Sequence, residues 1–425
     1  MLDDMQRLPA PPSSRRPRSA ATVALVLAAA GLTVPVSASS AARPAPTRSA
    51  SPAVHATDPS GLGPSRQVSL APVGGGVREV RAALPAGTST LRSDRFTMVG
   101  ATWTGAGEPR VQFSLRARDG WGGWRDLPVL HDGPTAGAEG DGVRGTDLVW
   151  VGASSSVRVR TLGQRPQGLR LLLLDTSGRP AADPAPEPTP SPEPTAEPTS
   201  EPTSAPTTEP TAAPTAQPTE QAAPRRSAPP PRMRPRKKWG AKEKWRTSPP
   251  VMRRTLKQVH VHHTASSNSY GRDDVPGILR GFYRYHTKSL GWSDIGYNVL
   301  VDRFGRAWVG RYGGDMVQGA HTLGFNHNSI GVAVIGDYRK KKPTRPVIRT
   351  VARVAAWQLD KNERRAVGKV KVVSKGSDRF RRGKKVTLPV IDGHLHTNQT
   401  ACPGRQLVKV LPGIRSRAQY RIRRH

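Results

Sequence analysis

The spacing of apolar and polar residues predicts strands in the first half of the chain. Residues 111–118 alternate between the two kinds of side chain, and residues 157–160 repeat the alternation. A period of two is typical of a strand with one buried face. The apolar run 169–174 predicts a further strand, and Asp-Gly pairs such as Asp132-Gly133 predict turns between the runs. We therefore predict that residues 65–178 form an all-β, sandwich-like accessory domain.

Four tryptophans in this β-rich region have two possible roles. They either anchor the core or form a face on which sugars stack, and we favour the core. The region contains no cluster of catalytic groups. The tryptophans are Trp103, Trp121, Trp124 and Trp150.

Helical and strand patterns alternate after residue 236. Asp273–His286 and Val347–Glu363 repeat apolar residues with a helical period. Ile330–Ile335 is an apolar run that predicts a central strand. Residues 236–425 are therefore predicted to form an α/β domain with a mixed central β-sheet flanked by helices. Shorter strands are predicted at Gln258–His262 and, as a hairpin, at Tyr297–Val301 and Ala307–Val309.

A proline-rich spacer separates these two regions. Proline recurs at every fourth residue from Pro194 to Pro218, mostly followed by threonine. Proline at this density prevents a helix and favours extended polyproline II. We predict a disordered Pro/Thr/Glu-rich linker over residues 179–235. Such a linker suits a domain that searches a porous polymer, and a passive connection fits the pattern equally well.

The chain begins with the pattern of an export signal. The apolar run Ala20–Val36 follows three arginines and ends at small residues, which predicts a secretory signal peptide over residues 1–42. A membrane anchor is the alternative, but the run is shorter than the roughly 20 residues that span a bilayer. The Arg15-Arg16 pair leaves the export route open between the general secretory and twin-arginine systems. Residues 43–64 are predicted to be disordered, and we expect a secreted protein, extracellular or attached to the cell wall, with no transmembrane segment after cleavage.

Composition and charge narrow the range of partners. The chain has 425 residues, a formal net charge of +35 and 35% hydrophobic residues, which is low for a wholly folded chain. From Arg225 to the end, 45 Lys and Arg stand against 11 Asp and Glu. A basic half of this kind indicates an anionic partner. For an exported protein we expect anionic cell-wall polymers rather than nucleic acid, because the basic runs lack the interleaved aromatic residues of single-strand binders.

The single cysteine, Cys402, excludes an internal disulfide, a Cys-rich zinc finger and an iron–sulfur cluster. It follows His394 by eight residues, and His262 ends a predicted strand. Two imidazoles and one thiolate are ligands that zinc prefers, and three protein ligands leave a fourth position for water. Zinc lowers the pKa of that water toward ~7.

The choice of ligand within each histidine cluster stays open on the sequence alone. His260 shares a strand face with His262, whereas His263 points to the opposite face. His396 could replace His394. A lone cysteine or histidine is also commonly an ordinary core or surface residue.

Several segments between residues 236 and 411 resemble the peptidoglycan recognition protein family, zinc amidases of the type-2 N-acetylmuramoyl-L-alanine amidase class. They follow the family's order and spacing, and the set is specific although each piece alone is not. The β-rich region resembles, more weakly, accessory domains of actinobacterial members. The segments are Trp239-Gly240-Ala241, His262-His263-Thr264-Ala265, Gly291-Trp292-Ser293-Asp294-Ile295-Gly296-Tyr297-Asn298, Gly319-Ala320-His321, Ser329-Ile330-Gly331-Val332 and Gly393-His394 to Cys402-Pro403-Gly404.

The resemblance implies one zinc ion bound by His262, His394 and Cys402. It also implies that Tyr297 assists the zinc-bound water or the developing oxyanion. The implied reaction is hydrolysis of the amide bond between the lactyl group of N-acetylmuramic acid and the L-alanine of the peptidoglycan stem peptide. We expect Thr400 to orient the water or the intermediate; some members carry Lys at that position and other active members carry Thr. Non-catalytic members typically lose the cysteine or the tyrosine, and this chain keeps both.

Five further residues are expected to contact substrate. Two of them, His321 and Asn326, could instead close turns, and Tyr297 of the catalytic set could pack on Trp292. The chain has Leu395-His396 where family members often have Arg-Asp or similar residues. That departure changes the loop after the second zinc histidine, and His396 is a candidate acid for the leaving amine. The five are His263, Trp292, His321, Asn326 and His396.

Two other functions compete with the amidase. A non-catalytic peptidoglycan-binding module would bind the wall without zinc-dependent release of peptide. A secreted polyanion-binding protein would use the basic runs Arg339–Lys342, Arg379–Lys385 and Arg415–Arg424, and its affinity would fall steeply with salt. We expect a monomer.

Overall fold

The computed structural model describes residues 64–134, 142–180 and 227–425. The predicted signal peptide, residues 43–63 and most of the predicted linker lie outside these ranges. We call the described residues 64–180 the accessory domain and residues 227–425 the C-terminal domain. In the described part of the chain, no helix combines the length and apolar character needed to cross a bilayer.

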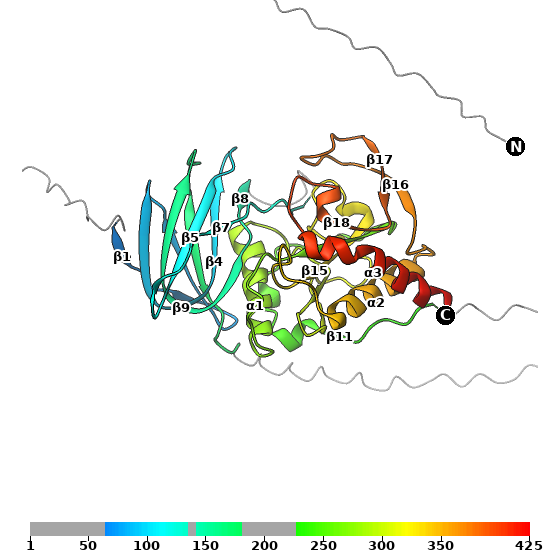
Figure 1. Cartoon of the computed structure of the whole chain (residues 1–425), viewed down its shortest axis with the longest axis horizontal. Helices are drawn as coiled ribbons and strands as arrows, with labels where there is room; N and C mark the ends of the chain where they lie inside the picture. The colour runs from blue at the N-terminus through cyan, green and yellow to red at the C-terminus, as the bar shows by residue number, and fades with distance from the viewer. Residues whose placement is uncertain (1–63, 135–141, 181–226) are drawn as a thin grey trace, which may run out of the picture. The chain divides into compact units, whose positions relative to one another are not determined.

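The accessory domain is built from strands, as the alternating pattern predicts. Its described strands join into one ten-stranded network, with β2-β3-β10-β4-β9-β5-β6 as the main path (Figure 1). Shifts of register within β4 and β9 let these two long strands bend and pair with several neighbours. The strands are β1 (Ser65–Gln67), β2 (Ala71–Gly74), β3 (Val77–Ala83), β4 (Thr88–Thr104), β5 (Arg110–Ala117), β6 (Gly120–Trp121), β7 (Arg125–Leu127), β8 (Val143–Gly145), β9 (Val149–Leu162) and β10 (Arg170–Asp175).

The four tryptophans of this domain divide between core and surface. Trp103 and Trp150 are buried, as the core role requires. Trp121 and Trp124 are only partly buried, and the Arg158 guanidinium lies over both rings, at 4.4 and 5.3 Å from the ring centroids. The prediction of core anchors therefore holds for two of the four.

The C-terminal domain has a six-stranded mixed sheet with the order β11-β14-β13-β15-β12-β18. The apolar strand predicted to be central, β15, pairs in parallel with β12 on one side and β13 on the other. The predicted hairpin forms between β13 and β14. Its six strands are β11 (Met233–Arg234), β12 (Gln258–His263), β13 (Val299–Val301), β14 (Ala307–Val309), β15 (Ser329–Val334) and β18 (Ile391–Gly393). Two further strands, β16 (Lys369–Val373) and β17 (Lys385–Pro389), pair with each other in a separate antiparallel sheet.

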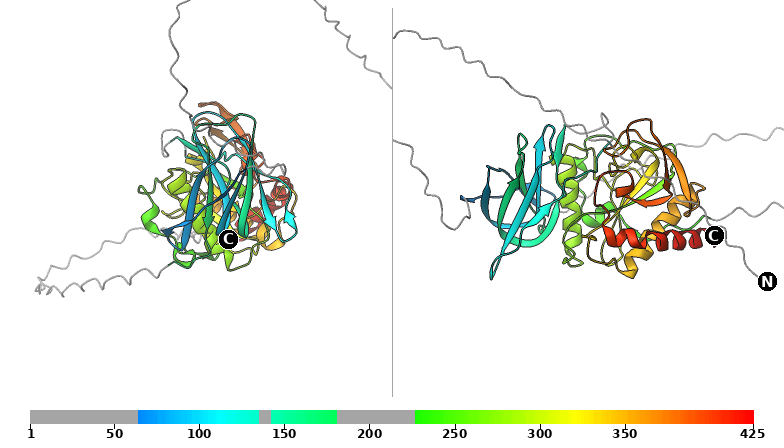
Figure 2. Two further views of the ribbon diagram at one scale, coloured as in Figure 1. Left: turned by 90° about the vertical axis from the view of Figure 1, so that its left-hand side faces the viewer. Right: turned by 45° about the horizontal axis from the view of Figure 1, so that its top comes forward.

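Both predicted helices of this domain form, and the structure adds a third. Helix α1 (Asp274–Arg284) continues into a π-helical turn, η3 (Tyr285–Ser289), and α2 spans Arg345–Lys361. Sequence analysis missed α3 (Arg405–Arg423), which packs beside α2 (Figure 1 and the right view of Figure 2). The short helical turns are η1 (Arg236–Trp239), η2 (Glu243–Trp245), η4 (Asn326–Asn328) and η5 (His394–His396).

The end of the predicted linker packs against the C-terminal domain. Ala228 is buried in the core formed by α2, α3 and the sheet. Its backbone N–H donates to Asp360 Oδ2 at 2.6 Å. Residues 227–235 therefore belong to the packed part of the chain, and β11 joins the sheet at its edge.

One of the hydrophobic clusters spans both domains. The buried face of α1, including Ile278 and Phe282, belongs to the same apolar cluster as Met98 and Leu174 of the accessory sheet. The interface also contains buried hydrogen bonds: the Tyr285 hydroxyl donates to the main-chain carbonyls of Ala101 and Thr146 in the accessory domain. Association of the domains therefore removes apolar surface of α1 from water.

Candidate metal centre

Three side chains from two distant parts of the sequence meet at one end of the central sheet. His262 comes from β12, His394 begins η5 after β18, and Cys402 lies in the loop before α3. Their ligand atoms all lie within 4.8 Å of one another, and His262 and His394 are fully buried. The parallel pairing of β12 with β18 brings the two histidines to the same edge.

The separation of His262 and Cys402 fits a tetrahedral metal ion. Zinc–nitrogen bonds of ~2.0–2.1 Å and a zinc–sulfur bond of ~2.3 Å place nitrogen and sulfur about 3.6 Å apart at tetrahedral angles. The Cys402 Sγ atom lies 3.7 Å from His262 Nδ1. Two imidazoles and one thiol are also the donor set that zinc prefers, so these residues fit a zinc ion.

Two glycines allow the close packing on which this geometry depends. Gly404 has φ +87°, and a Cβ there would lie 2.5 Å from the Tyr338 backbone. Gly331 lies under the His321 ring, which a Cβ would approach to 2.3 Å. Any other residue at either position would displace the loop of Cys402 or the ring that supports His262.

His262 is oriented from behind by polar groups. Its Nε2 atom lies 3.1 Å from His321 Nδ1 and 3.3 Å from Thr322 Oγ1. The Asn326 side-chain oxygen accepts hydrogen bonds from the backbone N–H groups of His321 and Thr322, both at 2.9 Å. His321 and Asn326, predicted as substrate contacts, are fully buried here, where His321 contacts His262 and Asn326 holds the backbone of His321.

The other candidate histidines lie outside the cluster. His260 pairs with buried Asp392. His263 Nδ1 accepts a hydrogen bond from Tyr338 N at 3.2 Å. The His396 ring nitrogen Nδ1 contacts the backbone of Gly393 at 2.9 and 3.1 Å. Of the alternatives left open by the sequence, the geometry favours His262 over its neighbours and His394 over His396.

Burial keeps the three candidate ligands uncharged when no cation is present. It lowers the pKa of His262 and of His394 well below the ordinary value. It also raises the pKa of the Cys402 thiol well above its usual range. Neutral imidazoles are ready to donate a lone pair, whereas the thiol must lose its proton when a metal ion binds.

The accessory domain contributes a carboxylate that sequence reasoning did not single out. Asp132 Oδ1 lies 3.1 Å from His394 Nδ1 and 3.4 Å from His262 Nδ1. Its Oδ2 accepts a hydrogen bond from the Tyr297 hydroxyl at 2.5 Å. The Asp132-Gly133 pair was predicted as a turn of a sheet, but the structure places it in an irregular segment at the metal centre. No local signal in the sequence distinguishes it from the other Asp-Gly pairs.

The remaining predicted site residues surround this centre. Tyr297 is buried, and its ring centroid lies 5.5 Å from that of His262. Burial, together with Asp132, raises the pKa of Tyr297 well above its usual value, so the hydroxyl keeps its proton. Trp292 stacks on His286 with a centroid separation of 4.5 Å. The Thr400 hydroxyl accepts a hydrogen bond from Cys402 N at 3.2 Å.

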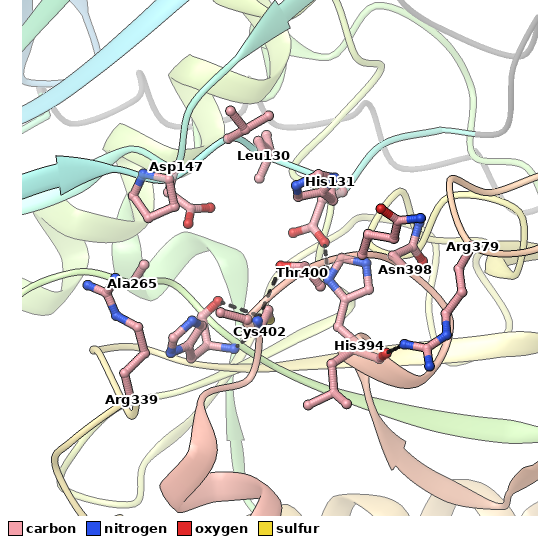
Figure 3. A pocket seen from close by; sticks show the side chains of 17 residues that line it. Leu130, His131, Asp147, Ala265, Arg339, Arg379, His394, Asn398, Thr400 and Cys402 are labelled. Carbon is pink, nitrogen blue, oxygen red and sulfur yellow. Dashed lines mark hydrogen bonds and ion pairs between the residues drawn. The ribbon is translucent and has the colours of Figure 1, made fainter. Parts of the chain in front are cut away.

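A pocket of about 560 Å³ adjoins the cluster, and His394 and Cys402 are among its lining residues. Figure 3 shows Leu130, His131 and Asp147 of that domain across the pocket from His394 and Cys402. Other residues that line it are Pro128, Val129, Asp132, His263, Ala265, Arg339, Arg379, Leu395, Asn398, Gln399, Thr400 and Ala401. The lining therefore combines both domains.

Sequence profiles of two families match this chain. Residues 252–405 match the family described as N-acetylmuramoyl-L-alanine amidase. Residues 43–213 match the family described as Rv3811 N-terminal galactose-binding domain-like.

Individual relatives match the C-terminal region. Human N-acetylmuramoyl-L-alanine amidase is 38% identical over 123 residues, which are 28% of this chain and 21% of the human protein. The chain thus spans about a fifth of that relative's length. Peptidoglycan-recognition protein SC2 of Drosophila melanogaster is 30% identical over 168 residues, 39% of this chain and 77% of the relative. The solved structure of peptidoglycan recognition protein-LE with tracheal cytotoxin is 28% identical, with a TM-score of 0.34, over 43% of this chain and 92% of that one.

Proposed function

Since the chain belongs to the family of peptidoglycan recognition proteins and N-acetylmuramoyl-L-alanine amidases, we propose that it is a zinc-dependent amidase of peptidoglycan. The bond cleaved joins the lactyl group of N-acetylmuramic acid to the L-alanine of the stem peptide. The observation that carries the proposal is the meeting of His262, His394 and Cys402, whose ligand atoms lie within 4.8 Å of one another, beside a pocket.

Zinc in this set of three ligands would supply a Lewis acid that polarises a carbonyl and lowers the pKa of water. The chain's own groups would hold and orient the reactants. The buried Tyr297 hydroxyl keeps its proton, so it is a hydrogen-bond donor for the oxyanion that develops at the scissile carbonyl. Because the Thr400 oxygen already accepts a bond from Cys402 N, its proton is available to orient a water molecule or the substrate.

The five predicted substrate residues take three different places in this proposal. His263 lines the pocket, and Trp292 lines the adjoining hollow formed with Leu130 and Asp132. His321 and Asn326 act through His262 and hold its ring in place. His396 is part of the loop that carries His394, and its Nδ1 is engaged with the backbone. We therefore do not assign it the role of acid for the leaving amine.

We further propose that the protein is exported by the predicted signal peptide and acts on the wall as a monomer. Its basic runs support this location. Lys340–Lys342 and Arg381–Lys385 are exposed, and such runs would concentrate the enzyme on the anionic polymers of a cell wall.

The decisive experiment measures peptide release by the full-length, zinc-loaded protein. Peptidoglycan is incubated with the protein, and free stem peptides that begin with L-alanine are sought by mass spectrometry. We expect release that a chelator abolishes, that added zinc restores and that Cys402→Ala eliminates. Ser416→Ala, on the exposed side of α3 and outside the pocket, is the matched control and should behave as wild type.

A zinc titration accompanies this assay. Zinc should raise the melting temperature of the wild type and not that of Cys402→Ala, because a ligand that binds only the folded state stabilises it. The amidase would be contradicted if the zinc-loaded wild type and the Asp132→Ala variant both bound the wall and neither released stem peptide. The protein would then be a recognition module.

A further inference from the structure

The Asp132 carboxylate lies within 3.4 Å of both candidate histidine ligands. Nitrogen and oxygen atoms bound to one zinc ion at tetrahedral angles lie about 3.4 Å apart. Asp132 Oδ1 lies 3.1 Å from His394 Nδ1 and 3.4 Å from His262 Nδ1. The side chain is 4% exposed, and Oδ1 has no hydrogen-bond donor within the described residues. A buried acceptor without a donor is rare and calls for an unseen partner.

The residues on either side of Asp132 use other polar groups around the same centre. The Gly133 carbonyl accepts a hydrogen bond from the Asn326 side-chain amide at 2.7 Å. His131 pairs with Asp378 of the C-terminal domain at 2.9 Å. Asp132 Oδ2 accepts a hydrogen bond from the Tyr297 hydroxyl. In the proposed amidase that hydroxyl would donate to the substrate oxyanion instead. The segment 131–133 therefore engages the site through three consecutive residues.

The accessory sheet positions this segment. Val129 forms a bridge with Thr146, and Leu130 N donates to the Gly145 carbonyl at 2.9 Å. The Thr146 carbonyl in turn accepts the Tyr285 hydroxyl at 2.8 Å. The location of Asp132 thus depends on the docking of the whole accessory domain onto the end of α1.

We propose that Asp132 is the fourth ligand of the metal ion in the resting protein, and that the accessory domain thereby closes the position which a catalytic metal keeps open. Four protein ligands are typical of a closed, structural zinc site, whereas catalysis needs one exchangeable position. The consequence for activity rests on the proposed amidase function. The docked form is then latent, and peptidoglycan cleavage requires the segment 131–133 to leave the centre.

Cobalt(II) in place of zinc gives a test that is independent of activity, because the visible spectrum of the ion reports its ligands. The full-length wild type is compared with Asp132→Ala and Asp132→Asn. Asp126→Ala is the control, since Asp126 is a half-exposed carboxylate of the same domain that binds Arg110 and Gln112. Azide serves as the probe of an open coordination position.

We expect the wild-type and control cobalt spectra to be insensitive to azide, and the Asp132→Ala spectrum to respond to it. Asp132→Asn keeps the shape of the side chain and an acceptor for Tyr297, and it guards against a variant that fails to fold. Chelator competition should show metal affinity at least about tenfold weaker in Asp132→Ala, the lower end of the loss seen when even an outer partner of a metal ligand is removed. If azide changed the wild-type cobalt spectrum as much as that of Asp132→Ala, the assignment of Asp132 as the fourth ligand would be overturned.

Peptide release measured on the same proteins separates this inference from the proposed function. If Asp132→Ala releases stem peptide at least tenfold faster than the wild type and the control, the result supports both the latency inference and the amidase function. An azide-responsive Asp132→Ala protein that releases no peptide retains the ligand assignment and removes the amidase. A wild type that releases peptide faster than Asp132→Ala would make the carboxylate part of the catalytic machinery and overturn latency.

Discussion

Replacing Tyr285 by phenylalanine should loosen the attachment of the accessory domain to the C-terminal domain. The Tyr285 hydroxyl is fully buried and reaches two main-chain carbonyls of the accessory domain, those of Thr146 at 2.8 Å and Ala101 at 3.1 Å. Burial raises the pKa of Tyr285 above its usual value, so the hydroxyl remains a neutral donor.

The magnitude follows from which carbonyl loses its donor. The Ala101 carbonyl keeps a second hydrogen bond, from Thr146 N at 2.9 Å, whereas no other donor to the Thr146 carbonyl is found in the described residues. A buried acceptor left without a donor costs about 1–3 kcal/mol. Tyr285→Phe should therefore lower the free energy of unfolding by about 2 kcal/mol, a change of roughly thirtyfold in the folded-to-unfolded ratio.

Urea unfolding, followed by tryptophan fluorescence and circular dichroism, measures this loss. Both probes should report one transition, because the domains share a core, and the midpoint should fall with little change in slope. Tyr312→Phe is the matched control: its side chain is 45% exposed, and the expected change is within about 0.5 kcal/mol. A Tyr285→Phe loss as small as that of the control, or two separate wild-type transitions, would refute the reasoning.

Three further predictions concern pH, charge and salt. Burial lowers the pKa of His286 to about 3, so as pH falls below ~6.5 the unfolded state takes up a proton that the folded state does not; this group alone should lower stability by about 1.4 kcal/mol for each pH unit of acidification down to about 3, and His286→Gln should reduce the slope of urea titrations by that amount while the share of other buried histidines, such as His262 and His394, stays. Arg236 forms a buried ion pair with Asp294 and a second, partly exposed one with Glu243, so Arg236→Ala, which leaves the buried Asp294 carboxylate unpaired, should cost about 3–5 kcal/mol in calorimetry, and a loss below 1 kcal/mol would contradict it. Binding to walls that retain their anionic polymers should weaken as salt rises, less steeply when the exposed lysines 340–342 are replaced by serine, as pelleting assays can show.

Local periodicity predicted most of the elements that hold the candidate metal centre. The strand β15 and the helix α2 follow directly from their apolar spacing, and the structure places both as expected. Helix α3 escaped prediction although Leu407, Leu411 and Ile414 form a buried stripe at helical spacing. Its interior proline, Pro412, and its many arginines obscured the pattern.

The contribution of the accessory domain to the site could not be predicted from the sequence. Asp132 lies about 130 residues from His262, and a contact over that separation leaves no periodic signal. The packing partner of α1 could not be predicted either, because an apolar stripe on a helix predicts that one face is buried but does not identify the element that covers it. The motif residues were found because the resemblance joins them into one set, to which Asp132 does not belong.

The way in which the two domains are joined decides how the metal centre could open. Departure of the whole accessory domain would expose the apolar face of α1, including Ile278 and Phe282, at a cost of about 25 cal/mol for each Å² of apolar surface. Far fewer contacts hold the segment 131–133 to its own sheet. They are the bridge between Val129 and Thr146 and neighbouring backbone hydrogen bonds such as that from Leu130 N to the Gly145 carbonyl. Short segments with few such bonds open locally at a small fraction of the global free energy. If Asp132 is the fourth ligand, local release of this segment is therefore the cheaper route to an active site, and a long linker would not be needed to separate the domains.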